Sequence, residues 1–155
     1  IGHLQSNKVK YIAPFVSFIH SVDSFKLLQE INKQAAKFQR IIPCFLQVHI
    51  AKEDTKTGVS EEEFFAICRG DELAKLTHVS IKGLMGMSTF TDDETIIREE
   101  FKRLKYLFDQ ASTFSLPANC SMQEISMGMS GDWPIALEEG STYIRVGSAI
   151  FGERH

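Results

Sequence analysis

The sequence has few cysteines, no long apolar run and no excess of basic residues. Its three cysteines, Cys44, Cys68 and Cys120, lie far apart within apolar runs, which argues against a disulfide framework or a thiolate metal site. No apolar stretch approaches the roughly 18 residues of a membrane span, and no charged and then apolar leader opens the chain. We therefore expect a cytoplasmic protein with no membrane partner.

The balance of charge argues against a nucleic-acid-binding surface. There are 17 lysines and arginines against 20 acids, a net charge of -3, and the basic residues are spread among the acidic ones. Such a chain has no broad positive field for a phosphate backbone, so we expect no nucleic-acid partner. Any phosphate ligand would need local hydrogen-bond donors.

Short β-rich runs alternate with amphipathic helical stretches along the whole chain. After a first helix at 6–12, a second begins at the cap Ser24 and carries an apolar stripe that ends at Phe38. The residues expected at later helix starts are Ser60 with Glu63 in a capping box, Asp92 with Asp93 before a long helix, and Asp132 as a cap. This alternation predicts a parallel α/β sheet with right-handed crossovers. At 155 residues and 43% apolar composition, we expect one domain over residues 1–155. The predicted strands are 15–22, 44–51, 79–85, 120–127 and 142–146.

Five strands are too few for one familiar α/β architecture. A closed (β/α)₈ barrel needs eight strands and typically about 250 residues, so this chain cannot close one alone. A complete, open flavodoxin-like sheet has the right size and is the alternative. The chain begins at Ile1 without a Met, inside what reads as the end of a strand. That start favours a barrel that lacks an N-terminal part.

Two small-residue turns follow the last two predicted strands. The first is Gly128-Met129-Ser130 and the second is Gly147-Ser148, and each is followed by a helix. Backbone N–H groups in such turns bind anions, and barrels commonly hold a phosphate between the loops after their last two strands. The same residues also suit plain βα turns and helix caps, so spacing alone leaves both interpretations open.

Several segments resemble the YggS/PROSC family of pyridoxal phosphate homeostasis proteins. The most specific are SMGMS at 126–130 and RVGSAIFGER at 145–154. The match runs along the whole chain and includes IGHLQSNK at 1–8, HSVDS at 20–24, Glu53 with Lys56 and Gly58, and GLM at 83–85.

The resemblance implies a fold and a cofactor. The fold is the (β/α)₈ TIM barrel of the alanine racemase N-terminal domain type, here without its first two strands and most of the third. The cofactor is pyridoxal 5'-phosphate (PLP). The family's Schiff-base lysine lies on the first strand and is absent from this chain. The implied cofactor-binding residues are Ser126, Ser130, Gly147 and Ser148 at the phosphate end, Arg145 at the pyridine nitrogen, and Met129 and Val146 beside them.

Arg145 ends the last predicted strand and is the best single candidate for a ligand contact. A guanidinium stays protonated, so beside a pyridine nitrogen it keeps that ring unprotonated and weakens it as an electron sink. The alternative is an exposed arginine paired with Glu139 or Glu153. The histidines have no metal-pair spacing and no nucleophile elbow is present, so we expect no metal site and no hydrolase triad.

These features favour a non-catalytic carrier or regulator of PLP in vitamin B6 homeostasis. One alternative is a fold-type III racemase or decarboxylase, which needs a second domain and an added acid or base. Another is a phosphosugar-binding enzyme that uses the same turns. An incomplete barrel would expose apolar strand edges, so we also expect self-association.

Overall fold

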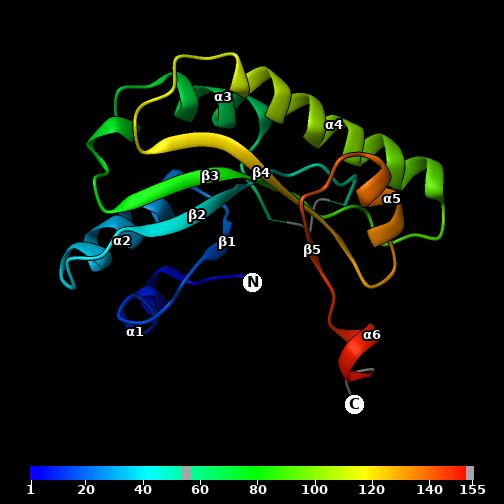
Figure 1. The fold of residues 1–155 in the computed structure, drawn as a ribbon, viewed down its shortest axis with the longest axis horizontal. Helices are drawn as coiled ribbons and strands as arrows, with labels where there is room; N and C mark the ends of the chain where they lie inside the picture. The colour runs from blue at the N-terminus through cyan, green and yellow to red at the C-terminus, as the bar shows by residue number, and fades with distance from the viewer. Residues whose placement is uncertain (54–56, 153–155) are drawn as a thin grey trace.

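The computed structural model describes residues 1–53 and 57–152. Lys56, Glu153 and Arg154, which belong to the resemblance, lie outside the described residues. Five parallel strands form one curved sheet in the order β1-β2-β3-β4-β5 (Figure 1). This sequential order is that of a barrel wall and differs from the flavodoxin-like order 2-1-3-4-5, so the open-sheet alternative is wrong. The strands are β1 (Ile19–Val22), β2 (Ile42–Gln47), β3 (Val79–Met85), β4 (Cys120–Met129) and β5 (Tyr143–Arg145).

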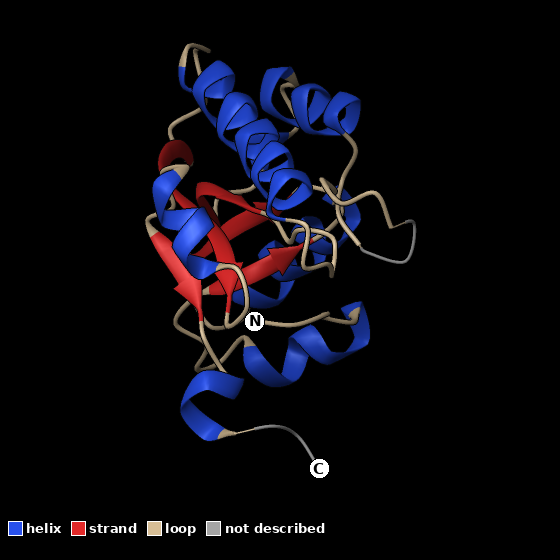
Figure 2. Ribbon diagram, turned by 90° about the vertical axis from the view of Figure 1, so that its right-hand side faces the viewer, coloured by secondary structure: helices blue, strands red, loops and turns tan. Residues whose placement is uncertain are grey.

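The helices that connect successive strands lie at the predicted positions and cover one face of the sheet (Figure 2). A short 3₁₀ turn (Ser6–Lys8) leads into α1, and a second one (Leu73–Lys75) follows α3. The first strand is shorter than predicted and begins at Ile19. The helices are α1 (Val9–Ile12), α2 (Phe25–Ala36), α3 (Glu61–Arg69), α4 (Glu94–Ser112), α5 (Trp133–Glu138) and α6 (Ser148–Phe151).

The core lies between the sheet and these helices. Alternate side chains of the strands, such as Cys44 and Leu46 of β2, pack against apolar residues of α2 and α4, including Ile31 and Phe101. Because side chains alternate across a strand, the residues between them face the opposite, concave side. The predicted stripe of α2 is wrong at Phe38: the helix ends at Ala36, and Phe38 is 46% exposed.

Two helix starts follow the rules that predicted them. Ser60 and Glu63 form a reciprocal capping box at α3, with N–H to oxygen distances of 3.1 and 2.8 Å. The Asp93 carboxylate accepts the amide of Thr95 at the start of α4. At α5 Asp132 occupies the predicted N-cap position, but its side chain makes no capping hydrogen bond there and turns back toward β4.

The three cysteines are free, buried thiols on the helix side of the sheet. Burial raises the pKa of the Cys68 thiol and of the Cys120 thiol to about 12, and raises the pKa of Cys44 further. Each thiol therefore stays protonated at neutral pH. None of the described helices is long and apolar enough to cross a membrane.

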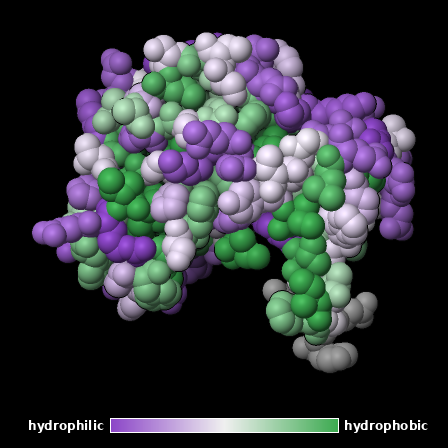
Figure 3. Space-filling model, viewed as in Figure 1, coloured by the Kyte–Doolittle hydropathy of each residue, from purple (hydrophilic) through white to green (hydrophobic). Residues whose placement is uncertain are grey.

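The C-terminal end leaves the body of the molecule as an apolar arm. After β5 the chain runs away from the sheet into α6, as Figure 1 shows. Ile150 and Phe151 of α6 are 68% and 87% exposed, and Figure 3 shows hydrophobic side chains along this arm. The strands β1 and β5 are the two edges of the sheet. The expected self-association stays a prediction.

Candidate functional site

Aromatic side chains gather on the concave face of the sheet. Phe45 lies between two residues of the helix-facing core, so its ring points to the opposite side. Its ring centroid is 4.5 Å from that of Phe18, 4.8 Å from that of His20 and 5.6 Å from that of Tyr143. The strands β1, β2 and β5 thus share one aromatic wall. Such a wall suits a flat ring better than a flexible chain.

A hydrogen-bonded chain of polar groups crosses this face beside the aromatic wall. Arg145 at the end of β5 donates from Nη1 to Ser126 Oγ of β4 at 2.9 Å. Its Nη2 donates to the carbonyl oxygen of Gly86, just after β3, at 2.9 Å. The same Ser126 hydroxyl lies 3.2 Å from Nδ1 of His20 in β1. The Arg145 guanidinium can only donate, so the Ser126 oxygen accepts from it. The hydroxyl hydrogen of Ser126 is then free to be donated to Nδ1 of His20.

Burial shifts the titration of both ends of this chain. Burial lowers the pKa of Arg145 to about 10, opposed by the negative charge of Asp132, so the guanidinium remains protonated at neutral pH. Burial lowers the pKa of His20 to about 4, helped by the positive charges of the N-terminus and Arg145. His20 is therefore neutral at pH 7 and suited to accept the Ser126 hydroxyl hydrogen.

Arg145 is a mostly buried cation at the end of β5. Among residues 1–53 and 57–152, no acid lies within ion-pair distance of its guanidinium. The predicted alternative partner Glu139 instead accepts from Arg98 at 2.6 Å, so that pairing is wrong. Glu153 lies outside the described residues. A buried positive charge at the carboxyl end of a barrel strand suits an electron-rich ligand.

The second cluster joins the two predicted turns. Ser130, just after β4, accepts the backbone N–H groups of Gly147 at 3.2 Å and Ala149 at 3.3 Å through its Oγ. Gly147 precedes α6, Ser148 is its first residue and is exposed, and Val146 lies half-buried between them and Arg145. The Ser130 hydroxyl therefore holds the turn after β5 against the turn after β4.

The turn after β5 opens onto free space. A Cβ atom built on Gly147 would have no heavy atom within 4 Å. By contrast, Gly128 has φ of +96°, and a Cβ there would lie 2.6 Å from Cβ of Ala136. Gly128 is thus needed for packing, whereas the missing side chain of Gly147 leaves room for a group outside the protein. This room lies beside the exposed Ser148 and fits a phosphate.

The structure brings the predicted residues together in two groups. Ser126 and Arg145 form one, Ser130 with Gly147 and Ser148 forms the other, and Met129 pairs in register with Arg145 between them. The resemblance placed Ser126 at the phosphate end, whereas its hydroxyl contacts Arg145. Sequence reasoning missed three participants. They are the Gly86 carbonyl, which has no sequence signal, His20, whose segment enters only through the resemblance, and Asp132, whose pattern predicts a helix cap.

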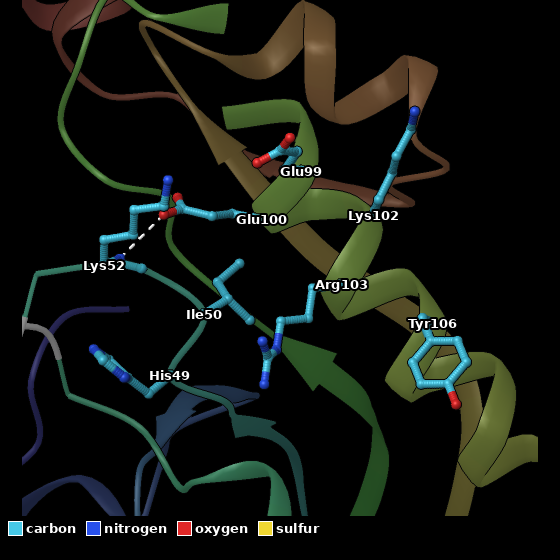
Figure 4. Close-up of a pocket in the computed structure, with 9 residues that line it drawn as sticks. His49, Ile50, Lys52, Glu99, Glu100, Lys102, Arg103 and Tyr106 are labelled. Atoms are coloured by element: carbon cyan, nitrogen blue, oxygen red, sulfur yellow. Dashed lines mark hydrogen bonds between the residues drawn. The ribbon is translucent and has the colours of Figure 1, made fainter. Parts of the chain in front are cut away.

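A separate cavity of about 630 Å³ lies between α4 and the segment that follows β2 (Figure 4). Arg103 on its wall pairs with Glu61 at 2.8 Å, and the Lys52 amide donates to the buried Glu100 carboxylate at 3.0 Å. The cavity shares no residue with the two clusters described above. Arg103 and Glu100 already have partners within the protein, and none of the residues predicted to bind the cofactor lines this cavity, so we do not assign the candidate site to it.

A family model and several solved structures match this arrangement. The model of the alanine racemase N-terminal domain matches residues 1–155. This chain belongs to that family. The predicted fold class is confirmed, and the five-stranded sheet is part of that family's barrel. An alanine racemase from Clostridium difficile has the same fold, with a TM-score of 0.73 at 14% identity over 99% of this chain and 39% of that one.

Relatives with higher identity include pyridoxal phosphate homeostasis proteins. The pyridoxal phosphate homeostasis protein of Aquifex aeolicus is 36% identical over 154 residues, which are 99% of this chain and 65% of that protein. The chain thus spans about 65% of the length of that relative. PipY of Synechococcus elongatus matches with a TM-score of 0.89 without PLP, at 32% identity over 98% of this chain and 69% of PipY. With PLP bound, PipY matches with a TM-score of 0.80 at 33% identity, over 98% of this chain and 68% of PipY. The resemblance found in the sequence is confirmed.

Proposed function

We propose that this chain forms the PLP-binding wall of a pyridoxal phosphate homeostasis protein, a carrier or regulator of the cofactor. The observation that carries the proposal is the protonated, mostly buried Arg145 near an open turn that carries the exposed Ser148. A cation and an open serine-bearing turn at one sheet edge match a phosphorylated, electron-rich ring. The relatives that are named for PLP homeostasis and the PLP-bound PipY support the same ligand.

In this proposal each cluster binds one end of the cofactor. Ser130, Gly147 and Ser148 bind the phosphate, and Arg145, positioned by Ser126, faces the ring nitrogen. Met129 and Val146 lie between the two ends. PLP supplies an aldehyde and an electron-withdrawing ring. Because the Arg145 guanidinium cannot supply a proton at neutral pH, it favours an unprotonated ring nitrogen and so a weak electron sink.

The titration of His20 supports binding without turnover. A general base works best when its pKa lies near the working pH, and the pKa of His20 is about 4. At neutral pH the ring accepts a hydrogen bond from Ser126 and binds few protons. His20 is thus a poor acid or base for a racemase or decarboxylase, which remains the alternative function. The single-domain organisation and the cytoplasmic location stay predictions.

A titration tests the proposal on the 155-residue chain. We expect reversible PLP binding, seen as a change in the cofactor's absorbance, and no stoichiometric pyridoxyl adduct by mass spectrometry after borohydride. Arg145→Ala should weaken PLP binding by about 10-fold to 100-fold, the worth of a hydrogen bond to a charged group. Arg103→Ala, which removes an exposed guanidinium, is the matched control.

Two results would contradict the proposal. A stoichiometric adduct on one lysine of this chain would mean that it contains an attachment site that we did not recognise. Exchange of the α-proton of a free amino acid, abolished by Arg145→Ala, would favour the racemase or decarboxylase alternative.

A further inference from the structure

The carboxylate of Asp132 points away from the helix that it precedes and back into the sheet edge. Its Oδ1 accepts the backbone N–H of Met129 at 2.6 Å, and its Oδ2 accepts the hydroxyl of Ser88 at 2.5 Å. Asp132 is 7% exposed and Ser88 is 3% exposed. A buried carboxylate is costly unless donors surround it, and hydrogen bonds to a charged oxygen are short and strong. This contact therefore fixes both partners.

The segment that carries Ser88 is held by a second buried acid, Glu100. It lies between β3 and α4, next to Thr89, whose backbone N–H donates to Glu100 Oε2 at 2.6 Å and whose hydroxyl donates to Oε1 at 2.7 Å. Glu100 is 5% exposed and belongs to the long helix α4. The hydroxyl that reaches Asp132 thus comes from a segment anchored to the body of the fold.

On its other side Asp132 determines where the first turn points. The amide it binds belongs to Met129, the residue before Ser130. The hydroxyl of Ser130 in turn accepts the amides of Gly147 and Ala149. Hydrogen bonds, joined by the backbone between adjacent residues 88–89 and 129–130, therefore connect α4 through Asp132 to both turns of the candidate phosphate site.

We propose that Asp132, with Ser88 as its partner, is a positioning residue that orients the two turns for a phosphate ligand. For the identity of that ligand the inference rests on the proposed function. Asp132 touches no ligand in this role; it holds the Met129 amide and, through it, the Ser130 hydroxyl. If Asp132 has this role, substituting it should weaken binding of the phosphate group of a ligand and leave binding of its ring unchanged.

Two ligands separate these ends in titrations of the 155-residue chain. PLP carries the phosphate, and pyridoxal lacks it. Asp132→Ala and Ser88→Ala should each weaken PLP binding by about 10-fold and leave pyridoxal binding within about twofold. Asp132→Asn keeps an oxygen for the Met129 amide and should restore most of the PLP affinity. Asp109→Ala and Ser112→Ala on the exposed side of α4 are matched controls that should change neither affinity.

Amide hydrogen exchange gives a second readout that needs no ligand. In Asp132→Ala the amides of Met129, Gly147 and Ala149 should exchange faster, while amides of β2 and α4 keep their protection. Should Asp132→Ala fail to fold, Ser88→Ala leaves the Asp132 carboxylate and its bond to the Met129 amide in place and carries the same test.

The outcomes distinguish this inference from the proposed function. If the unaltered chain binds PLP and Asp132→Ala binds it equally well, the positioning role is wrong. An equal loss of PLP and pyridoxal binding, not restored by Asp132→Asn, would also overturn it. If the unaltered chain binds neither PLP nor pyridoxal, the proposed function fails. The positioning role is then judged by amide exchange alone, and it is wrong if the Met129 amide exchanges at the same rate in Asp132→Ala as in the unaltered chain.

Discussion

The two faces of the sheet are built from different kinds of side chain. The face toward the helices is apolar throughout, with residues such as Leu46, Ile81 and Phe101 fully buried. The concave face carries the aromatic wall together with Ser126, His20 and Arg145. Burial of apolar area dominates folding stability, whereas buried polar groups add little net stability. The comparison teaches that the helix side holds the fold together and the concave side is available for binding.

The largest expected effect on stability comes from the helix side. Phe101→Ala removes a fully buried ring of α4 and should lower the free energy of unfolding by about 3–5 kcal/mol. Urea unfolding measures this loss. The folded fraction should keep its PLP affinity, because Phe101 has no contact with the concave face. A loss below about 1 kcal/mol would contradict the division between the faces.

A pair of glycines sharpens the comparison at the edge of the site. Gly128→Ala places a methyl 2.6 Å from Ala136 at a φ of +96°, so it should destabilise the fold by about 1–3 kcal/mol. Gly147→Ala enters open space and should change stability by less than about 0.5 kcal/mol while weakening PLP binding. Thermal unfolding and a PLP titration of both variants provide the check. Equal destabilisation by the two would argue against an open turn.

Arg145 tests whether binding and stability separate on the concave face. Arg145→Met removes a buried charge, which relieves its desolvation, but leaves Ser126 and the Gly86 carbonyl without their donor. These effects oppose each other, so the free energy of unfolding should change by no more than about 1 kcal/mol. Loss of PLP binding with nearly unchanged urea stability is the expected result. Severe destabilisation would mean that Arg145 is mainly structural.

The smallest expected effect is the pH dependence of His20. Its pKa is about 4 in the folded protein against an ordinary 6.5, so the unfolded chain binds more protons between those values. The stability tied to neutral His20 is thus fully present above pH 6.5 and is lost as the pH falls toward 4. Unfolding measured across this range in the unaltered chain and in His20→Gln should show a shallower fall for the variant. Identical pH profiles would refute the assignment.

Most of the fold could be predicted from the sequence because it depends on local patterns. Alternating strand and helix periods located the five strands, and Ser60 with Glu63 marked a helix start through neighbours three residues apart. The prediction for Phe38 is wrong because apolar residues at helical spacing continue in the sequence past Ala36, where the helix itself ends. The flavodoxin-like alternative could not be excluded from the sequence, since strand order depends on contacts between distant segments.

The site was only partly predictable for the same physical reason. Its residue types were identified from glycine and serine in the turns and from an arginine at a strand end. The partners of those residues were not, because a backbone carbonyl such as that of Gly86 has no sequence signature. Asp132 lies at the position of a helix cap, yet its carboxylate accepts a hydrogen bond from Ser88, which lies 44 positions away in the sequence. A hydrogen bond between residues distant in the sequence thus determines the orientation of the Asp132 side chain, which the local capping pattern does not predict.

The buried cysteines can be used to detect local opening of the folded chain by thiol labelling. Thiol reagents attack the thiolate, and burial with a raised pKa suppresses that form in Cys44, Cys68 and Cys120. Alkylation in the native state must therefore wait for a local or global opening event. Because the three thiols lie on β2, α3 and β4, the order in which they acquire a label would reveal which layer of the molecule separates first.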